Sequence, residues 1–252
     1  MTEPDSPERA TPRIFPPVLV LGLVALAVVL MAMMAGFGSR LGLWHFRTGF
    51  TLLEWAAYGA IGVVILSLPA IWLTRPGSGR RGFWIPLLAL IVSIPVFVIP
   101  WQWRSTAGGV PPIHDITTDL DDPPEFVAVV PLRADAPNPP EYAGPETAAQ
   151  QREAYPELGP VVLNETLSGA FHRALDVVSE MGWELVDFDP DQGRIEATDR
   201  TFWFGFEDDV VIRLTPDGDG TRVDIRSKSR VGRGDAGTNA RRIESFLDRL
   251  TR

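Results

Sequence analysis

The chain has 252 residues, 45% of them hydrophobic, with a net charge of −9 at neutral pH and no cysteine. The absence of cysteine excludes disulfides, thiolate catalysis and thiolate zinc sites. Residues 1–103 hold 7 basic and 4 acidic residues, a net charge of +3, whereas residues 104–252 hold 16 and 28, a net charge of −12. Such an acidic half lacks the basic footprint of nucleic-acid binding, so no nucleic-acid partner is expected.

Three long apolar stretches lie in the first half of the chain, at about 17–36, 50–73 and 82–101. Each is long enough, at 1.5 Å per helical residue, to cross a hydrocarbon core of about 30 Å. Tryptophans lie at or near their ends, where amphipathic rings favour the headgroup layer. The sequence therefore predicts a tail at 1–16, three transmembrane helices within 17–103, and a lipid bilayer as the first partner.

Arginine counts predict the orientation of these helices. The tail and the second loop together carry five arginines, and the first loop with the start of the C-terminal region carries three. Since the more basic side faces the cytoplasm, the tail is predicted to be cytoplasmic. Residues 104–252 then form an extracytoplasmic domain of a multi-pass protein of the inner membrane.

The C-terminal region begins with a stretch that holds 11 prolines in residues 104–163. Within it, "EFVAVVPL" (125–132) suggests a short strand, and "PETAAQQREAY" (145–155) suggests a helix with proline in its first turn. Residues 164–182 repeat apolar side chains at helical spacing, with Asn164 as the expected N-cap and Gly182 just beyond the end.

Strands are expected at 183–189, 194–199, 209–216 and 221–229, because apolar and polar residues alternate there and turn sequences separate the runs. Val210, Ile212 and Leu214 then face one side of the sheet, and Arg213, Asp224, Arg226 and Lys228 face the other. A last helix is expected at about 236–251. The predicted fold is a membrane region of three helices followed by an α+β domain, in which helices cover one face of an antiparallel sheet of four or five strands.

Several phrases of residues 108–252 resemble the bacterial DUF1499 family, a domain of unknown function. They are "PPIHDITTDLDDPPEF", "NPPEYAG", "QQREAYP", "RIEATDRTFWFGFEDDVVIRL" and "DIRSKSRVGRGDAGTNARRIESFL". The resemblance implies a shared fold and a place in the cell envelope, and it implies no reaction.

Two groups of polar residues are candidate sites. His114, Asp115, Asp208 and Asp209 could serve a hydrolase or metal-dependent enzyme if they converge in space. Structural roles are the alternative, with Asp115 and Asp119 capping turns and Asp208 and Asp209 pairing with arginines. With one or two histidines and no cysteine available, no metal site and no cofactor are expected.

The second group lies in residues 222–242, which carry a net charge of +5 in an acidic domain and include a glycine-rich run that leads into a helix. Helix N-termini and clustered arginines favour anions, although the arginines could equally pair with the domain's own acids. The candidate ligand-binding residues are Arg213, Arg226, Lys228, Arg230, Arg233 and Asn239. We expect a non-enzymatic envelope protein whose domain binds an anionic ligand or another envelope protein.

Overall fold

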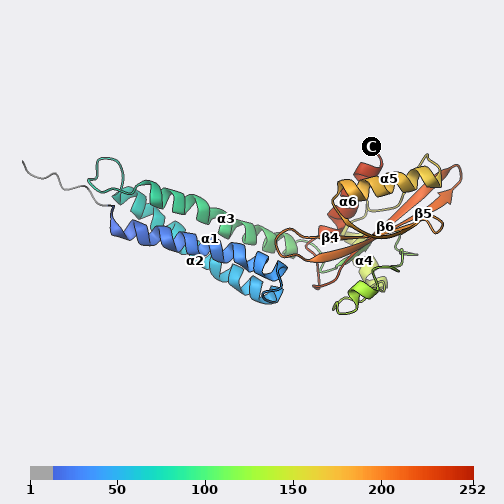
Figure 1. Ribbon diagram of the computed structural model, residues 1–252, viewed down its shortest axis with the longest axis horizontal. Coiled ribbons are helices and arrows are strands. Elements are labelled where there is room, and N and C mark those ends of the chain that lie inside the picture. The colour runs from blue at the N-terminus through green and yellow to red at the C-terminus, as the bar shows by residue number, and fades with distance from the viewer. Residues whose placement is uncertain (1–13) are drawn as a thin grey trace, which may run out of the picture. The chain divides into compact units, whose positions relative to one another are not determined.

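The computed structural model describes residues 14–252, so most of the predicted tail lies outside the described residues (Figure 1). The chain forms two compact units, one ending at Gln102 and the other beginning at Trp103. The first unit consists mainly of three helices, α1 (Pro16–Arg40), α2 (Phe46–Leu73) and most of α3 (Trp84–Gly108). All three are long and apolar enough to cross a membrane, as their composition predicts.

Small side chains allow the apolar helices to approach one another. Ala56 and Ala60 of α2 are fully buried. A β-carbon on Gly59 would lie 2.8 Å from a methyl group of Val28, so α1 and α2 touch at this glycine. Close packing of small residues is how helices associate in lipid, where no hydrophobic force drives them together.

The second unit is an α+β domain built on an antiparallel sheet, with strand order β1-β6-β5-β4-β3 and β2 also paired with β6. Its strands are β1 (Asp115–Thr117), β2 (Val161–Leu163), β3 (Glu184–Asp189), β4 (Arg194–Arg200), β5 (Glu207–Asp217) and β6 (Gly220–Ser229). Its remaining helices are η1 (Pro131–Arg133), α4 (Pro145–Ala154), α5 (Leu167–Glu180) and α6 (Thr238–Leu250). The sheet has six strands because β1 and β2, with three residues each, join the four predicted ones.

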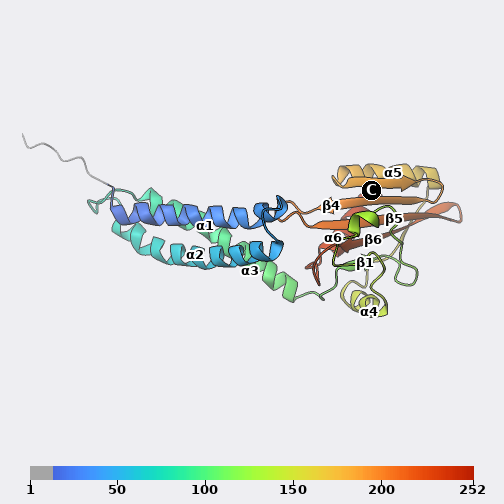
Figure 2. The same ribbon diagram turned by 60° about the horizontal axis from the view of Figure 1, so that its bottom comes forward.

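Helices α5 and α6 cover one face of the sheet, and α4 lies on the opposite side (Figures 1 and 2). The covered face is apolar, with Ile212 and Ile225 at 0% exposure against Ile243 and Phe246 of α6. Trp183 stacks on Phe246 with ring centroids 5.7 Å apart. The prediction that the alternating apolar residues of β5 and β6 share one face of the sheet is therefore confirmed.

Turns separate the strands where the sequence predicts them. Asp217 pairs with Gly220 across a two-residue connection, and Gly218 there has a φ of 60°. At the β3–β4 turn, Gly193 has a φ of 61°, and a β-carbon on it would lie 2.1 Å from the Leu214 carbonyl oxygen. Only glycine fits so close a backbone approach.

Two local predictions are wrong. The helix predicted from 164 begins at Leu167, because Val161–Leu163 is extended as β2 and Thr166, not Asn164, is the N-cap. The Thr166 hydroxyl accepts from the Gly169 N–H at 3.3 Å. Gly182 does follow the helix end, with a φ of 70°.

The strand predicted at 125–132 is instead a turn that leads into η1. Backbone N–H groups that a strand would use for pairing are taken by a carboxylate of the sheet, as described below. Residues 109–160, here called the covering segment, contain β1, this turn, η1 and α4, with little regular structure elsewhere.

Candidate functional site

The sheet face opposite α5 and α6, here called the charged face, is both ionic and buried. Asp115, Lys228, Asp209 and Thr198 lie in one row across β1, β6, β5 and β4. Asp115 and Asp209 are 0% exposed and Lys228 is 1% exposed. Buried charges must be paired and hydrogen-bonded, so the partners of this row define its role.

Asp115 is held by two cations of β6. The Arg226 guanidinium donates to both carboxylate oxygens at 2.8 and 2.9 Å, and Lys228 Nζ lies 3.0 Å from the Oδ2 atom. Lys228 also donates to the Glu141 carbonyl at 2.5 Å. Burial lowers the pKa of Lys228, and the Asp115 charge opposes that change. Asp115 therefore has its carboxylate fully engaged inside the domain.

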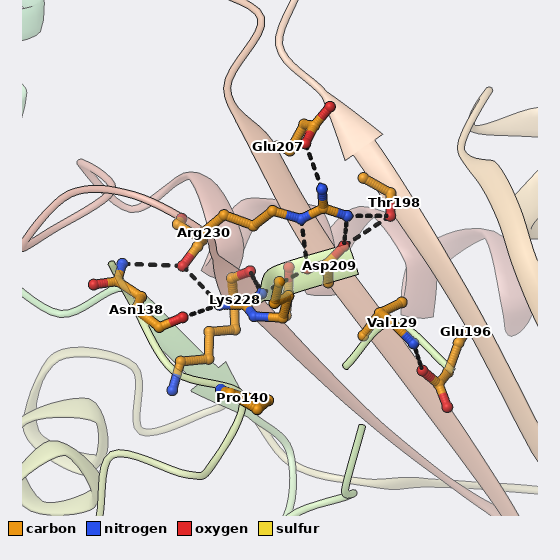
Figure 3. Close-up of polar contacts among 12 residues, drawn as sticks. Val129, Asn138, Pro140, Glu196, Thr198, Glu207, Asp209, Lys228 and Arg230 are labelled. Atoms are coloured by element: carbon orange, nitrogen blue, oxygen red, sulfur yellow. Dashed lines mark hydrogen bonds and ion pairs between the residues drawn. The ribbon is translucent and has the colours of Figure 1, made fainter. Parts of the chain in front are cut away.

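Asp209 has a comparable set of partners (Figure 3). It accepts from Arg133 at 2.6 Å, from Thr198 at 2.7 Å and from Arg230 at 2.8 and 2.9 Å. Arg230 also donates to Glu207 at 2.5 Å. This carboxylate has no capacity left for a proton transfer or a metal ion without breaking an ion pair.

Glu196 of β4 binds three consecutive backbone N–H groups, and its Oε1 atom also pairs with the Arg194 guanidinium at 3.3 Å. Its Oε1 atom accepts from the N–H groups of Val127 and Ala128, both at 3.0 Å, and its Oε2 atom accepts from Val129 at 2.9 Å (Figure 3). These are the donors that the predicted strand would have used. A strand cannot form there while one carboxylate holds three consecutive N–H groups.

The cations of the charged face hold carbonyl groups of the covering segment in the same way. Arg226 donates to the carbonyls of Pro124 and Pro140 at 3.1 and 3.0 Å, and Lys228 donates to that of Glu141. Arg133 belongs to the covering segment itself and donates to Asp209 of β5. Prolines lack an N–H, so their segment cannot complete a regular hydrogen-bond pattern. The charged face thus binds the chain's own covering segment.

The remaining candidate cation of this face lies at its other end. Arg213 contacts Asp119, Asp122 and Asp224 at 3.1, 2.8 and 3.3 Å. Asp119 also caps a turn, as predicted, by accepting from the N–H groups of residues 121 and 122. Of the six candidate ligand-binding residues, Arg213, Arg226, Lys228 and Arg230 are therefore all paired with the domain's own acids.

Asp208 and Asp209 are neighbours on β5 and face opposite sides of the sheet. Asp208 pairs on the helix side with Arg242 of α6 at 2.6 Å, and Asp199 contacts the same guanidinium at 2.7 Å. Because Asp208 and Asp209 point to opposite faces of the sheet, the four predicted catalytic residues do not face one site together.

The N-terminus of α6, predicted to attract an anion, is occupied by a carboxylate of the chain. Asp235 accepts from the Gly237 N–H at 2.8 Å and from the Asn239 N–H at 2.7 Å. Burial raises the pKa of Asp235, and these hydrogen bonds oppose that change. The Asn239 side chain is buried among Ser227, Ser229 and the His114 carbonyl. An external anion would find these donors taken.

One polar cavity of about 340 Å³ does lie on the domain, beside β1 and α4. Its polar lining residues are His114, Asp115, Glu146, Thr147, Gln150 and Arg233. The cavity is therefore lined by two predicted catalytic residues, His114 and Asp115, and by one predicted ligand-binding residue, Arg233 of the glycine-rich run.

His114 connects these two parts of the chain. Its Nδ1 atom lies 3.4 Å from the Arg233 carbonyl oxygen, across 119 positions of sequence. A carbonyl can only accept, so Nδ1 carries the proton in this contact and Nε2 remains an acceptor. Burial lowers the pKa of His114, and its hydrogen bond to Arg233 opposes the change. The neutral imidazole is therefore favoured at neutral pH.

Sequence reasoning missed several residues of both features. The sequence did not single out Glu196, which holds the covering segment, or Arg133, which ties that segment to Asp209. It also did not single out Glu146, Thr147 and Gln150, which line the polar cavity. A signal existed for Glu196, because it lies between two apolar residues of a short alternating strand. No group of His, Asp and Glu residues that could hold a metal ion occurs within residues 14–252, and cysteine is absent.

These features define a class of protein: three helices long and apolar enough to cross a membrane precede an α+β domain. One face of the sheet in that domain is ionic and is covered by an irregular segment of the same chain. The model of a family described as "Protein of unknown function (DUF1499)" matches residues 115–250, which is more than half of the chain. The protein belongs to this family, and the resemblance stated from its sequence is confirmed. No protein with a curated description matches the chain.

Proposed function

We propose that this protein is anchored in a membrane by α1, α2 and α3, and that its C-terminal domain binds a small polar ligand in the polar cavity. One observation carries the proposal: the cavity brings Arg233 and Glu146 to one opening, and both side chains lack a hydrogen bond or ion pair to any other part of residues 14–252. Most other arginines of the domain pair with its own acids. A hollow into which a few polar groups converge is the default candidate for a ligand site.

The lining suggests the chemistry of the ligand. Arg233 offers a guanidinium to an anionic group, whereas Glu146, Gln150 and the Nε2 atom of His114 offer acceptors to a donor. A cavity of about 340 Å³ lies at the small end of ligand sites. The proposed ligand is therefore a small molecule with one anionic group and one hydrogen-bond donor group, such as a phosphoethanolamine or a short peptide.

Ligand-observed NMR on the full-length protein in nanodiscs tests this proposal, with phosphoethanolamine, glycylglycine and inorganic phosphate as probes. We expect saturation transfer to a probe with both groups, and a loss of at least about tenfold in affinity for Arg233→Ala and Glu146→Gln, as expected for a charged contact. Glu153→Gln, on the same helix, is the matched control and should bind like the parent. Equal binding by all variants, or no binding of any probe, would overturn the proposal.

The side of the membrane is part of the same proposal. The arginine distribution supports a cytoplasmic N-terminus, and three crossings would then put the domain outside the cytoplasm, in the cell envelope. Reporter fusions after Arg252 test it, with alkaline phosphatase active only outside the cytoplasm and green fluorescent protein fluorescent only inside. An active phosphatase fusion and a dark fluorescent fusion are expected, and the reverse pair would contradict this placement.

A further inference from the structure

The loop between β4 and β5, residues 201–206, is the most aromatic part of the domain and is here called the aromatic loop. Its sequence TFWFGF holds four aromatic residues in six. Backbone contacts close the loop, because the N–H of Thr201 donates to the Phe206 carbonyl at 2.9 Å and the N–H of Phe206 donates to the Thr201 hydroxyl at 2.8 Å. The loop therefore presents its side chains from a fixed frame.

The aromatic loop has an inner and an outer part. Phe204 is 5% exposed and stacks on Phe206 with ring centroids 5.5 Å apart. Phe202 is 77% exposed, which is the highest value among the large apolar side chains of residues 14–252. Phe204 and Phe206 thus stack within the loop, whereas most of the Phe202 side chain is exposed to solvent.

The aromatic loop lies at the point where the chain enters the domain. Trp103, the first residue of the second unit, lies against Trp203 with ring centroids 5.5 Å apart. Six residues separate the end of α3 at Gly108 from the start of β1 at Asp115. At about 3.5 Å per residue, the start of β1 lies within roughly 25 Å of the end of α3.

The opposite end of β5 has a different chemistry. The β5–β6 turn carries Asp217 and Asp219 and no aromatic residue. Eleven strand residues separate the two ends, which is roughly 35 Å at about 3.3 Å per residue. One end of the sheet is thus aromatic and near the chain's entry, and the far end is acidic.

We infer that the aromatic loop inserts Phe202 and Trp203 into the interfacial layer of the lipid bilayer that holds α3. Aromatic side chains concentrate at this layer because their rings are apolar and the indole N–H stays hydrated. The insertion fixes the orientation of the domain, so that the acidic turn at the other end of β5 points into water. The inference rests on the membrane anchoring proposed above and is independent of the polar cavity.

The absence of cysteine makes a direct test practical, since one engineered cysteine can be labelled selectively. We would prepare the full-length variants Phe202→Cys, Asp219→Cys and Leu66→Cys, label each with an environment-sensitive nitrobenzoxadiazole dye, and insert them in nanodiscs with or without doxyl-labelled phosphatidylcholine. Phe202 is exposed, so its replacement does not disturb the core. Leu66 lies within α2 and reports on the anchoring itself.

We expect the dye at position 202 to emit at shorter wavelength and to lose at least half of its emission with doxyl lipid near the headgroups. The dye at 219 should stay unquenched, and the dye at 66 should be quenched by doxyl groups deeper in the chains. Quenching at 66 without quenching at 202, or equal quenching at 202 and 219, would overturn the inference and leave the anchoring intact. No quenching at 66 would overturn the anchoring.

Discussion

The two faces of the sheet are both buried at the centre of β6 and differ in chemistry. Ile225 and Arg226 are neighbours on β6, with exposures of 0% and 1%. Ile225 faces two helices, whose backbone groups are satisfied within each helix, so an apolar partner suffices. Arg226 faces a proline-rich part of the covering segment, whose carbonyl groups at Pro124 and Pro140 need donors. The comparison indicates that each face largely matches its cover: most side chains beneath the helices are apolar, whereas ionic side chains bind the backbone of the irregular segment.

The largest effect is expected from Asp115→Ala, which breaks the charged face. Arg226 and Lys228 would remain buried without their carboxylate, and removing one partner of a buried ion pair costs about 3–5 kcal/mol. Denaturant unfolding of the full-length protein in mild detergent measures the free energy. The control Asp121→Ala removes an exposed carboxylate of the same segment and should change it by less than about 0.5 kcal/mol.

Ile225→Ala breaks the apolar face of the same strand. Truncating a fully buried isoleucine leaves a cavity beneath the helices and costs about 2–5 kcal/mol. The same unfolding measurement gives this value, and the retained contacts of Arg226 predict that the covering segment stays bound in the native state. A loss below about 1 kcal/mol would show that this face tolerates poor packing.

Glu196→Gln sharpens the comparison on one residue. The substitution keeps the size of the side chain. In the parent protein both carboxylate oxygens accept from backbone N–H groups, whereas in the variant one oxygen is replaced by an amide N–H₂ group, which cannot accept. Leaving buried donors unsatisfied costs about 1–3 kcal/mol. Amide exchange at Val129 should speed up, whereas Glu157→Gln, an exposed change in the same segment, should leave it unchanged.

A smaller effect is expected from His114, whose pKa is lowered by burial. The folded protein then binds fewer protons than the unfolded chain between the lowered pKa and the ordinary value of 6.5. Stability therefore rises with pH through this window, levels off above 6.5, and is lost on acidification. His114→Gln should flatten this part of the profile between pH 7.5 and about 5.5. An unchanged slope in the variant would contradict the assignment.

Much of the fold followed from local patterns. The three apolar helices, the four longer strands, their turns and the apolar side of β5 and β6 were predictable, because each depends on periodicity or turn chemistry within a few residues. Strands β1 and β2 were not, because three residues carry no periodic signal and their pairing with β6 is a long-range event.

The candidate site was predictable only as a set of residues. Alternation placed Arg226 and Lys228 on the face away from the helices, but it could not show that a segment some 90 to 110 positions earlier in the chain covers that face. The role of Arg233 likewise depends on α4, which brings Glu146 to the same cavity. Alternation along a strand shows which residues share a face of the sheet, but it does not show which segment covers that face.

Hydrogen–deuterium exchange of the full-length protein in nanodiscs, compared between Asp115→Ala and Ile225→Ala, tests most directly whether ions fasten the covering segment while apolar packing fastens the helices. With Asp115→Ala, we predict faster exchange at the amides of residues 127–129 and slow exchange in α5 and α6. With Ile225→Ala, we predict faster exchange in α6 and unchanged amides at 127–129. The same exchange pattern in both variants would contradict the account.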